Sequence, residues 1–344
     1  MRSPLPLPPA DETHVPGMLL IRTGDDDDVW NDVLWRMGEL PGMRVAGDGS
    51  QVGPAGAADA GAASSIPRRL VVADDPAWRG ATAEEVAEAL EEPGIWVPDL
   101  VVLTDDRTAR NAEARTLLAF GSDDGDISGF WITPRQAAMT YLVLNRPLIS
   151  FVFEDFAERA PTEPEWEVED DEELGEDHLY EPVGVTMEAL SNPPRYTRPD
   201  HELPVLDHDI DLLVRTDFTD DAAWASLVDQ VAHPADDLYD DDLSDHVRLV
   251  DDPAFAGATP EQVLAHIRPS DDEEGMFAEV VLIADATTLH RAGQRVLVVP
   301  MSDDVGLTFR VDADQVRSML INLALSNQDI DDWRGEEKEE AEDA

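Results

Sequence analysis

Apolar residues along the C-terminal half of the chain form short runs separated by stretches with helical periodicity. Residues 212–216, 247–250 and 278–286 are such runs, and each predicts a strand. Between the first two, Trp224, Leu227, Val228 and Val231 recur at the spacing of one helix face. Two further strands and a last helix follow, so the predicted order is β-α-β-α-β-β-β-α. This order is typical of an α/β fold, with α+β as the alternative, in which helices pack on a mixed sheet.

Local signals place several of these elements. The run at 278–286 is nearly continuous in apolar residues, which is typical of a central strand buried on both faces. Thr259 precedes Pro260 and stands three residues before Gln262, so it predicts a helix start with a capping box. Thr82 and Glu85 form the same pattern earlier in the chain. We expect the last helix to begin near Asp312.

The N-terminal half repeats this pattern in the same order. Residues 74–86 (DDPAWRGATAEEV) match residues 251–263 (DDPAFAGATPEQV) at about nine of thirteen positions. Four more blocks match in sequence order: 19–30 with 212–224, 100–108 with 280–288, 115–124 with 295–304 and 130–136 with 309–315. In the match of 19–30 with 212–224, the second copy has one inserted residue. Five collinear blocks indicate a tandem duplication of one domain.

The duplication predicts the domain layout. A Pro-rich N-terminus at 1–16 is expected to be disordered, and the repeat domains occupy 17–159 and 206–334. Residues 41–67 are a Gly/Ala-rich insertion in the first copy. Residues 160–205 form an acidic linker and 335–344 an acidic tail. We expect the two copies to pack against one another.

Charge changes the picture of what the protein binds. Asp and Glu number 76 against 24 Lys and Arg, giving a net charge of −52, and Lys338 is the only lysine. Direct binding to nucleic acid or to an anionic membrane is therefore not expected, because both need clustered cations. The charge favours solubility, or an acidic face that meets a basic protein partner. Arginine in place of lysine suggests a GC-rich genome.

Several classes of site are excluded by the residues present. The chain has no cysteine, so disulfides, thiol nucleophiles and cysteine-based metal sites are absent, which fits a cytoplasmic protein. The Asp runs at 25–28 and 240–242 lack the ligand spacing of a calcium loop, and the first run precedes a predicted helix. The histidines form no metal-binding pair and no phosphate-binding loop is present. We therefore expect no cofactor, no metal and no catalytic residue.

One set of polar residues in the second copy could still hold a ligand, because two of its members, Arg215 and Asp285, lie at or near the C-terminal ends of predicted strands. In α/β sheets, ligands bind beyond the carboxyl ends of the strands. The alternative is that these residues form internal Asp–Arg pairs and helix caps. The set is Arg215, Asp217, Asp285, Arg310, Asn322 and Asn327, with Arg22 and Asp105 as counterparts in the first copy.

The second copy resembles a known family in five blocks: residues 212–224, 251–259, 280–288, 309–311 and 321–333. Together these are similar to the bacterial domain-of-unknown-function family 6924, found mainly in actinobacteria. The resemblance implies a small α/β domain without an established activity or cofactor. The first copy departs from the pattern, because Gly24 and Asp25 replace the residues at 217–219 and Tyr141 stands near the place of Asn322.

The sequence thus predicts a cytoplasmic, non-enzymatic protein–protein interaction module that binds a basic partner. An immunity-like or adaptor-like role would fit, because a doubled acidic domain can bind bivalently. One alternative is a small-molecule-binding domain or weak enzyme using Asp285 with Arg215 or Arg310. Another is an acidic mimic of DNA.

Overall fold

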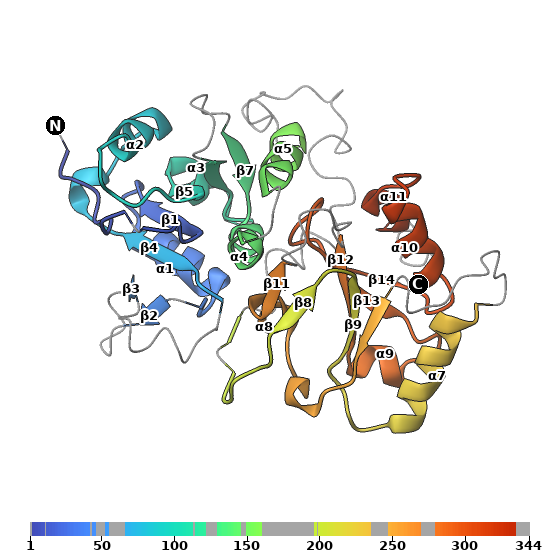
Figure 1. Cartoon of the computed structure of the whole chain (residues 1–344). Helices are drawn as coiled ribbons and strands as arrows, with labels where there is room; N and C mark the ends of the chain where they lie inside the picture. The colour runs from blue at the N-terminus through green and yellow to red at the C-terminus, as the bar shows by residue number, and fades with distance from the viewer. Residues whose placement is uncertain are drawn as a thin grey trace, which may run out of the picture. The chain divides into compact units, whose positions relative to one another are not determined.

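The structure, a computed structural model, forms two compact units, Met1–Glu202 and Leu203–Ala344 (Figure 1). It describes residues 2–10, 12–41, 43–45, 52–54, 66–112, 114–121, 129–145, 149–159, 196–197, 199–234, 247–269 and 279–334. Each unit contains a mixed five-stranded sheet with helices packed on it. The predicted α/β fold in two copies is therefore confirmed.

The first unit is built on the strand order β4-β1-β5-β6-β7. Three strands are parallel: β4 (Arg69–Ala73), β1 (Gly17–Arg22) and β5 (Leu100–Thr104). The last two, β6 (Leu117–Gly121) and β7 (Phe130–Ile132), continue the sheet as an antiparallel meander. The three parallel strands end at one edge of the sheet, which we call the carboxyl edge.

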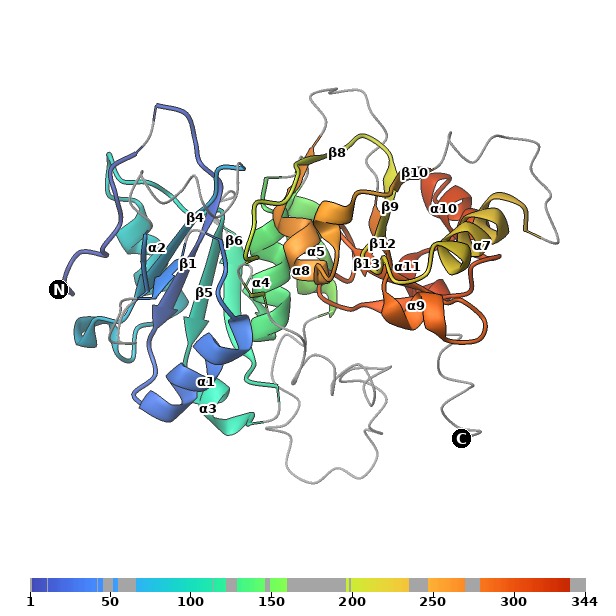
Figure 2. The same ribbon diagram turned by 90° about the horizontal axis from the view of Figure 1, so that it is seen from below.

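Helices cover both faces of this sheet (Figure 2). Val86 and Leu90 of α2 pack with alternate residues of β1, β4 and β5 on one face, while α1 and α4 contact each other on the other. The helices are α1 (Asp27–Met37), α2 (Ala83–Leu90), α3 (Asp106–Arg110), α4 (Pro134–Val143) and α5 (Ile149–Arg159), and η2 (Pro76–Trp78) is a single 3-10 turn.

The second unit repeats this topology with the order β10-β9-β12-β13-β14. Its strands are β9 (Asp211–Arg215), β10 (Val247–Val250), β12 (Val280–Ala284), β13 (Val296–Pro300) and β14 (Phe309–Val311). The predicted central strand β12 lies in the middle and all five of its residues are buried. A parallel pair, β8 (Leu206–His208) with β11 (Ile267–Pro269), forms a separate small sheet.

The helices of the second unit are α7 (Asp221–Ala232), η6 (Pro253–Phe255), α8 (Pro260–Ala265), α9 (Ala286–His290), α10 (Val316–Ala324) and α11 (Ile330–Arg334). Side chains of α7 and α10, including Trp224 and Leu320, share one core with β9 and β12. The helix expected near Asp312 begins instead at Val316, because residues 313–315 form a turn. The short helices α3 and α9 were not predicted.

The predicted helix starts are confirmed. Thr82 with Glu85 and Thr259 with Gln262 both form complete capping boxes. The first Asp run also caps a helix, because the Asp26 side chain accepts hydrogen bonds from the backbone of the first turn of α1. Aspartates at this position complement the positive end of the helix dipole.

Strand pairing corrects one of the sequence matches between the copies. Block 115–124 was matched to block 295–304, which pairs Arg115 with Arg295. In the sheets, Leu103 pairs with Leu118 and the equivalent Ile283 pairs with Leu297, so the true offset is one residue smaller. Arg115 and Gln294 accordingly share a positive φ, at 53° and 46°. The turn before this strand has one residue fewer in the second copy.

The Pro-rich N-terminus, predicted to be disordered, is instead ordered against the first unit over its described residues. Arg2 donates to the carbonyl oxygens of Ala77 and Arg79 at 2.7 and 3.0 Å, and to the Glu85 carboxylate at 2.8 Å. Leu5 is buried in the same core as Trp96. These contacts offset the entropic cost of ordering the segment. The composition of the segment did not reveal them.

Several predicted segments lie wholly or largely outside the described residues: the acidic linker, the acidic tail and most of the insertion. Of the insertion, β2 (Met43–Val45) and β3 (Val52–Pro54) form a short antiparallel pair. Among the described residues, no helix is long and apolar enough to cross a membrane.

Candidate functional site

The carboxyl edge of the second unit is organised around a buried arginine. Arg215, the last residue of β9, has a side chain only 3% exposed. Its guanidinium donates to the carbonyl oxygen of Asp217 at 2.9 Å, to Asp221 at 2.7 Å and to Asp251 at 3.1 Å. The group also lies over the rings of Phe218 and Trp224, at 4.5 and 5.6 Å. Arg215 thus ties together the loops after β9 and β10.

The first copy builds the same cluster from the equivalent residues. Arg22, with a side chain 5% exposed, binds Asp27 at 2.5 Å and Asp74 at 3.5 Å. Asp27 and Asp221 both lie in the first turn of the following helix, and Asp74 and Asp251 both follow the outer parallel strand. In this copy, Arg79 is a second cation that binds Asp74.

The carboxylates around these buried arginines point into solvent. Asp221 is 90% exposed and Asp251 is 50% exposed, although both bind Arg215. We call the exposed carboxylates at the carboxyl edges the acidic edge of each unit. They are Asp25, Asp26, Asp27, Asp28, Asp74 and Asp106 in the first unit, and Asp221, Asp251 and Asp252 in the second.

Asp285 and Arg310 form a second pair at the same edge. Two nitrogens of Arg310 bind the two carboxylate oxygens of Asp285 at 3.1 and 2.6 Å, and the Thr288 hydroxyl accepts a further bond at 3.1 Å. Asp285 also caps α9 by accepting from the Thr288 backbone. The Arg310 side chain is 21% exposed and that of Asp285 is 29% exposed, so the pair is not fully buried in the core.

The first copy has exchanged this pair for a different contact. Asp105 still caps α3, but Trp131 occupies the strand position of Arg310. The guanidinium of Arg107 lies 4.7 Å from the centre of the Trp131 ring, a cation–π distance. The salt bridge of the second copy is thus replaced by an aromatic contact.

Asp217 lies in a cluster specific to the second copy. Its carboxylate accepts from the Thr219 backbone at 2.8 Å and lies 2.8 Å from Nε2 of His290. The Thr219 hydroxyl contacts the same Nε2 at 2.9 Å. A Thr–His–Asp relay needs the hydroxyl and the carboxylate on opposite ring nitrogens, so this geometry is not that of a nucleophile triad.

The two asparagines of the candidate set take no part in these contacts. Asn322 donates to the Ser318 carbonyl oxygen at 2.8 Å within α10, and its own carbonyl oxygen accepts from the Asn327 backbone at 2.9 Å. Because β14 runs parallel to β12 in direction, α10 starts near the carboxyl edge and runs away from it. Both asparagines therefore lie at the C-terminal end of α10, away from the carboxyl edge.

The pairs keep the acids charged. Burial raises the pKa of Asp285, but the bonds from Arg310 and Thr288 outweigh it and the net shift is downward. For Asp217, burial likewise raises the pKa, and Thr219 and His290 more than reverse the effect. Burial lowers the pKa of Arg215, while Asp221 and Asp251 raise it overall. Every one of these groups is ionised at neutral pH.

These shifts predict acid sensitivity in the second unit. Because the folded pKa of Asp285 lies below the unfolded value of about 3.9, its stabilisation is present above that value and disappears as pH falls through the folded pKa. The Arg310→Gln variant should therefore lose less stability than the wild type between neutral pH and about pH 3. Urea midpoints across this range, with exposed Arg291→Gln as control, measure the difference. Parallel curves for Arg310→Gln and wild type would contradict it.

Sequence reasoning found the arginines but missed most of their partners. Asp251 and Asp74 were visible as the first residues of the strongest repeated block, and Asp221 and Asp27 as first-turn acids. The recurrence of Arg and both Asp residues in the two copies was the available signal. His290 gave no such signal, because the first copy has Arg110 at the equivalent position. Among the described residues, no group of three His, Asp or Glu side chains could hold a metal, and 240–242 lie outside them.

Comparison with protein-family profiles matches residues 17–163 and 211–342 to the family described as a domain of unknown function, DUF6924. The chain belongs to this family. The matched ranges cover the five-stranded sheets of both units, so the chain carries two DUF6924 copies. Searches of curated proteins and of solved structures found no match. The buried Arg with two Asp partners is a polar cluster that these two DUF6924 copies share.

Proposed function

We propose that this protein is a non-enzymatic interaction module, immunity-like or adaptor-like, that binds a basic protein through its acidic edges. The observation that carries the proposal is the Arg215 cluster. Its cation is buried and fully engaged inside the unit, whereas its carboxylate partners Asp221 and Asp251 face solvent. A fixed cation that orients exposed carboxylates prepares the surface for a cationic partner.

The repetition of the cluster supports the same function. Arg22 holds Asp27 and Asp74 in the first unit as Arg215 holds its partners in the second. Two linked acidic sites can bind one basic partner bivalently, which raises overall affinity without new contacts. The net charge of −52 would speed the encounter. The cysteine-free, lysine-poor composition fits our inference of a cytoplasmic, actinobacterial protein.

Ligand binding in the second copy is the alternative, and one observation favours it. His290 is 47% exposed at the carboxyl edge, beside Asp217 with a side chain 9% exposed. Against it, Arg215, Asp285 and Arg310 all have internal partners that a ligand would have to replace. Each such replacement costs a charge-assisted hydrogen bond.

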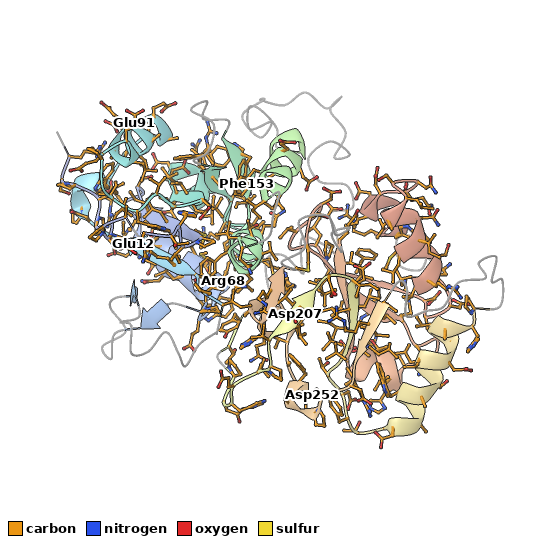
Figure 3. All side chains as sticks on the ribbon, viewed as in Figure 1. Glu12, Arg68, Glu91, Phe153, Asp207 and Asp252 are labelled. Carbon is orange, nitrogen blue, oxygen red and sulfur yellow. The ribbon has the colours of Figure 1, made fainter. Side chains whose placement is uncertain are left out.

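The test uses the full chain as bait in host lysate at low and high salt, followed by affinity measurement on the purified partner. The edge variant is Asp25→Asn, Asp28→Asn and Asp106→Asn. The control neutralises three exposed acids at the C-terminal end of α2, away from the carboxyl edge. Its substitutions are Glu88→Gln, Glu91→Gln and Glu92→Gln (Glu91 is labelled in Figure 3). The edge variant loses three ion pairs with the partner, so its affinity should fall about tenfold. The affinity of the control variant should stay within about twofold of the wild type.

Two results would overturn the proposal. One is that no basic protein is retained in a salt-sensitive manner. The other is that both variants weaken binding equally, which would assign the effect to total charge rather than to the acidic edge. A captured DNA-binding protein that nucleic acid displaces would indicate mimicry of DNA instead.

A further inference from the structure

Among the described residues, the outer strand of the second sheet has a paired strand on one side only. β10 pairs with β9 on one side, and its outward side has no hydrogen-bonded strand or loop among the described residues. Leu249 in this strand is 39% exposed, one of few large apolar side chains that are exposed in the described part of the chain. Unpaired backbone donors and acceptors on such an edge can accept a further strand.

The equivalent strand of the first copy, β4, also has no hydrogen-bonded outer neighbour among the described residues, but another strand lies beside it. β3, from the insertion that the second copy lacks, contacts β4, and Figure 1 shows it alongside. Val72, the residue of β4 at the place of Leu249, is partly buried. The two copies thus share the sheet and its unpaired outer strand, and differ in that β3 lies beside β4.

Carboxylates flank the outward side of β10 at both ends. Asp251 and Asp252 follow β10 directly, and Asp209 lies at the other end, just before β9 (Figure 3 labels Asp252 and Asp207). Arg248, within the strand, forms an ion pair with Asp209, so its charge is neutralised locally. The edge therefore presents backbone hydrogen-bonding groups with the exposed acids Asp251 and Asp252 at one end and the Arg248–Asp209 ion pair at the other.

We propose that β10 binds an extended basic segment of a partner protein as an added strand of the sheet. Backbone pairing would supply affinity, Leu249 would contact an apolar side chain, and Lys or Arg residues of the segment would reach Asp251 and Asp252. A second copy of this chain is disfavoured, because Arg248 is the one cation of β10 and is already paired with Asp209, so a second β10 would bring no free cation to Asp251 and Asp252. The inference rests on the proposed function and specifies the form of the partner.

The experiment is hydrogen exchange of the full chain with two decapeptides of equal charge, one of alternating Val and Arg and one of alternating Pro and Arg. Proline has no N–H group and cannot complete a strand. The Val–Arg peptide should slow exchange of the outward amides of 247–250 by about tenfold or more, and the Pro–Arg peptide should leave them unchanged.

A matched pair of variants locates the contact. Leu249→Lys places a charge on the edge and should weaken Val–Arg binding about tenfold. Leu325→Lys, at an exposed leucine after α10, should change it less than about twofold. Equal urea midpoints of the two variants will show that both remain folded.

The outcomes separate the two proposals. If both peptides bind equally and β10 stays unprotected, the added strand is wrong but attraction of a basic partner stands. If neither peptide binds at low salt, the charge attraction beneath both proposals is absent. Protection of β10 by the Val–Arg peptide alone, abolished by Leu249→Lys, supports the added strand.

Discussion

Replacing Arg334 with Met is expected to destabilise the second unit by about 3–5 kcal/mol. Arg334, at the end of α11, is 6% exposed and its Nη1 lies 2.7 Å from Oδ2 of Asp304, which is 1% exposed. The substitution leaves that carboxylate buried without its cation. Hydrogen exchange of the β9 and β12 amides gives the free energy of opening for this unit alone.

A second substitution tests the cause. Asp304 has a positive φ of 54°, a conformation that asparagine tolerates well. Adding Asp304→Asn to Arg334→Met removes the buried charge without straining the turn, so most of the lost stability should return. If the double variant were as unstable as Arg334→Met, lost packing rather than an unpaired charge would explain the effect.

Replacing Arg215 with Met is expected to cost about 2–3 kcal/mol. Three oxygens lose their donor, and Asp221 and Asp251 then repel one another. The cost is smaller than for Arg334 because these two carboxylates are partly exposed and can be hydrated. The same exchange measurement applies, with exposed Arg291→Met as a control expected to stay within about 0.5 kcal/mol. A change as small as that of the control would mean that Arg215 does not hold the loops together.

Elements governed by local patterns were predictable from the sequence. The buried strand β12 and the capping box at Thr259 follow from hydrophobic runs and from residue spacing. The register of β6 and β13 was misplaced, because a similar residue, Arg295, stands one position beyond the true match. Sequence identity favoured that alignment, whereas the positive φ at Gln294 shows where the turn lies.

Contacts that depend on distant segments were not predictable. The N-terminus looked disordered because its prolines carry no periodic pattern, yet Arg2 is anchored by carbonyl oxygens more than seventy residues away. Arg215 and Asp285 were found by their place at strand ends. Their partners depend on loops brought together by β9 and β10, and one sequence does not reveal that pairing.

The exchange of Arg310 for Trp131 has a consequence for how this tandem chain avoids misfolding. Adjacent similar domains risk swapping equivalent strands during folding. If the strand carrying Trp131 entered the second unit, Asp285 would lose its salt bridge and the ring would meet Thr287, where the first copy has Arg107. The two copies have thus diverged at a contact that would be lost in the swapped pairing, and we expect this loss to favour pairing of each sheet with its own last strand.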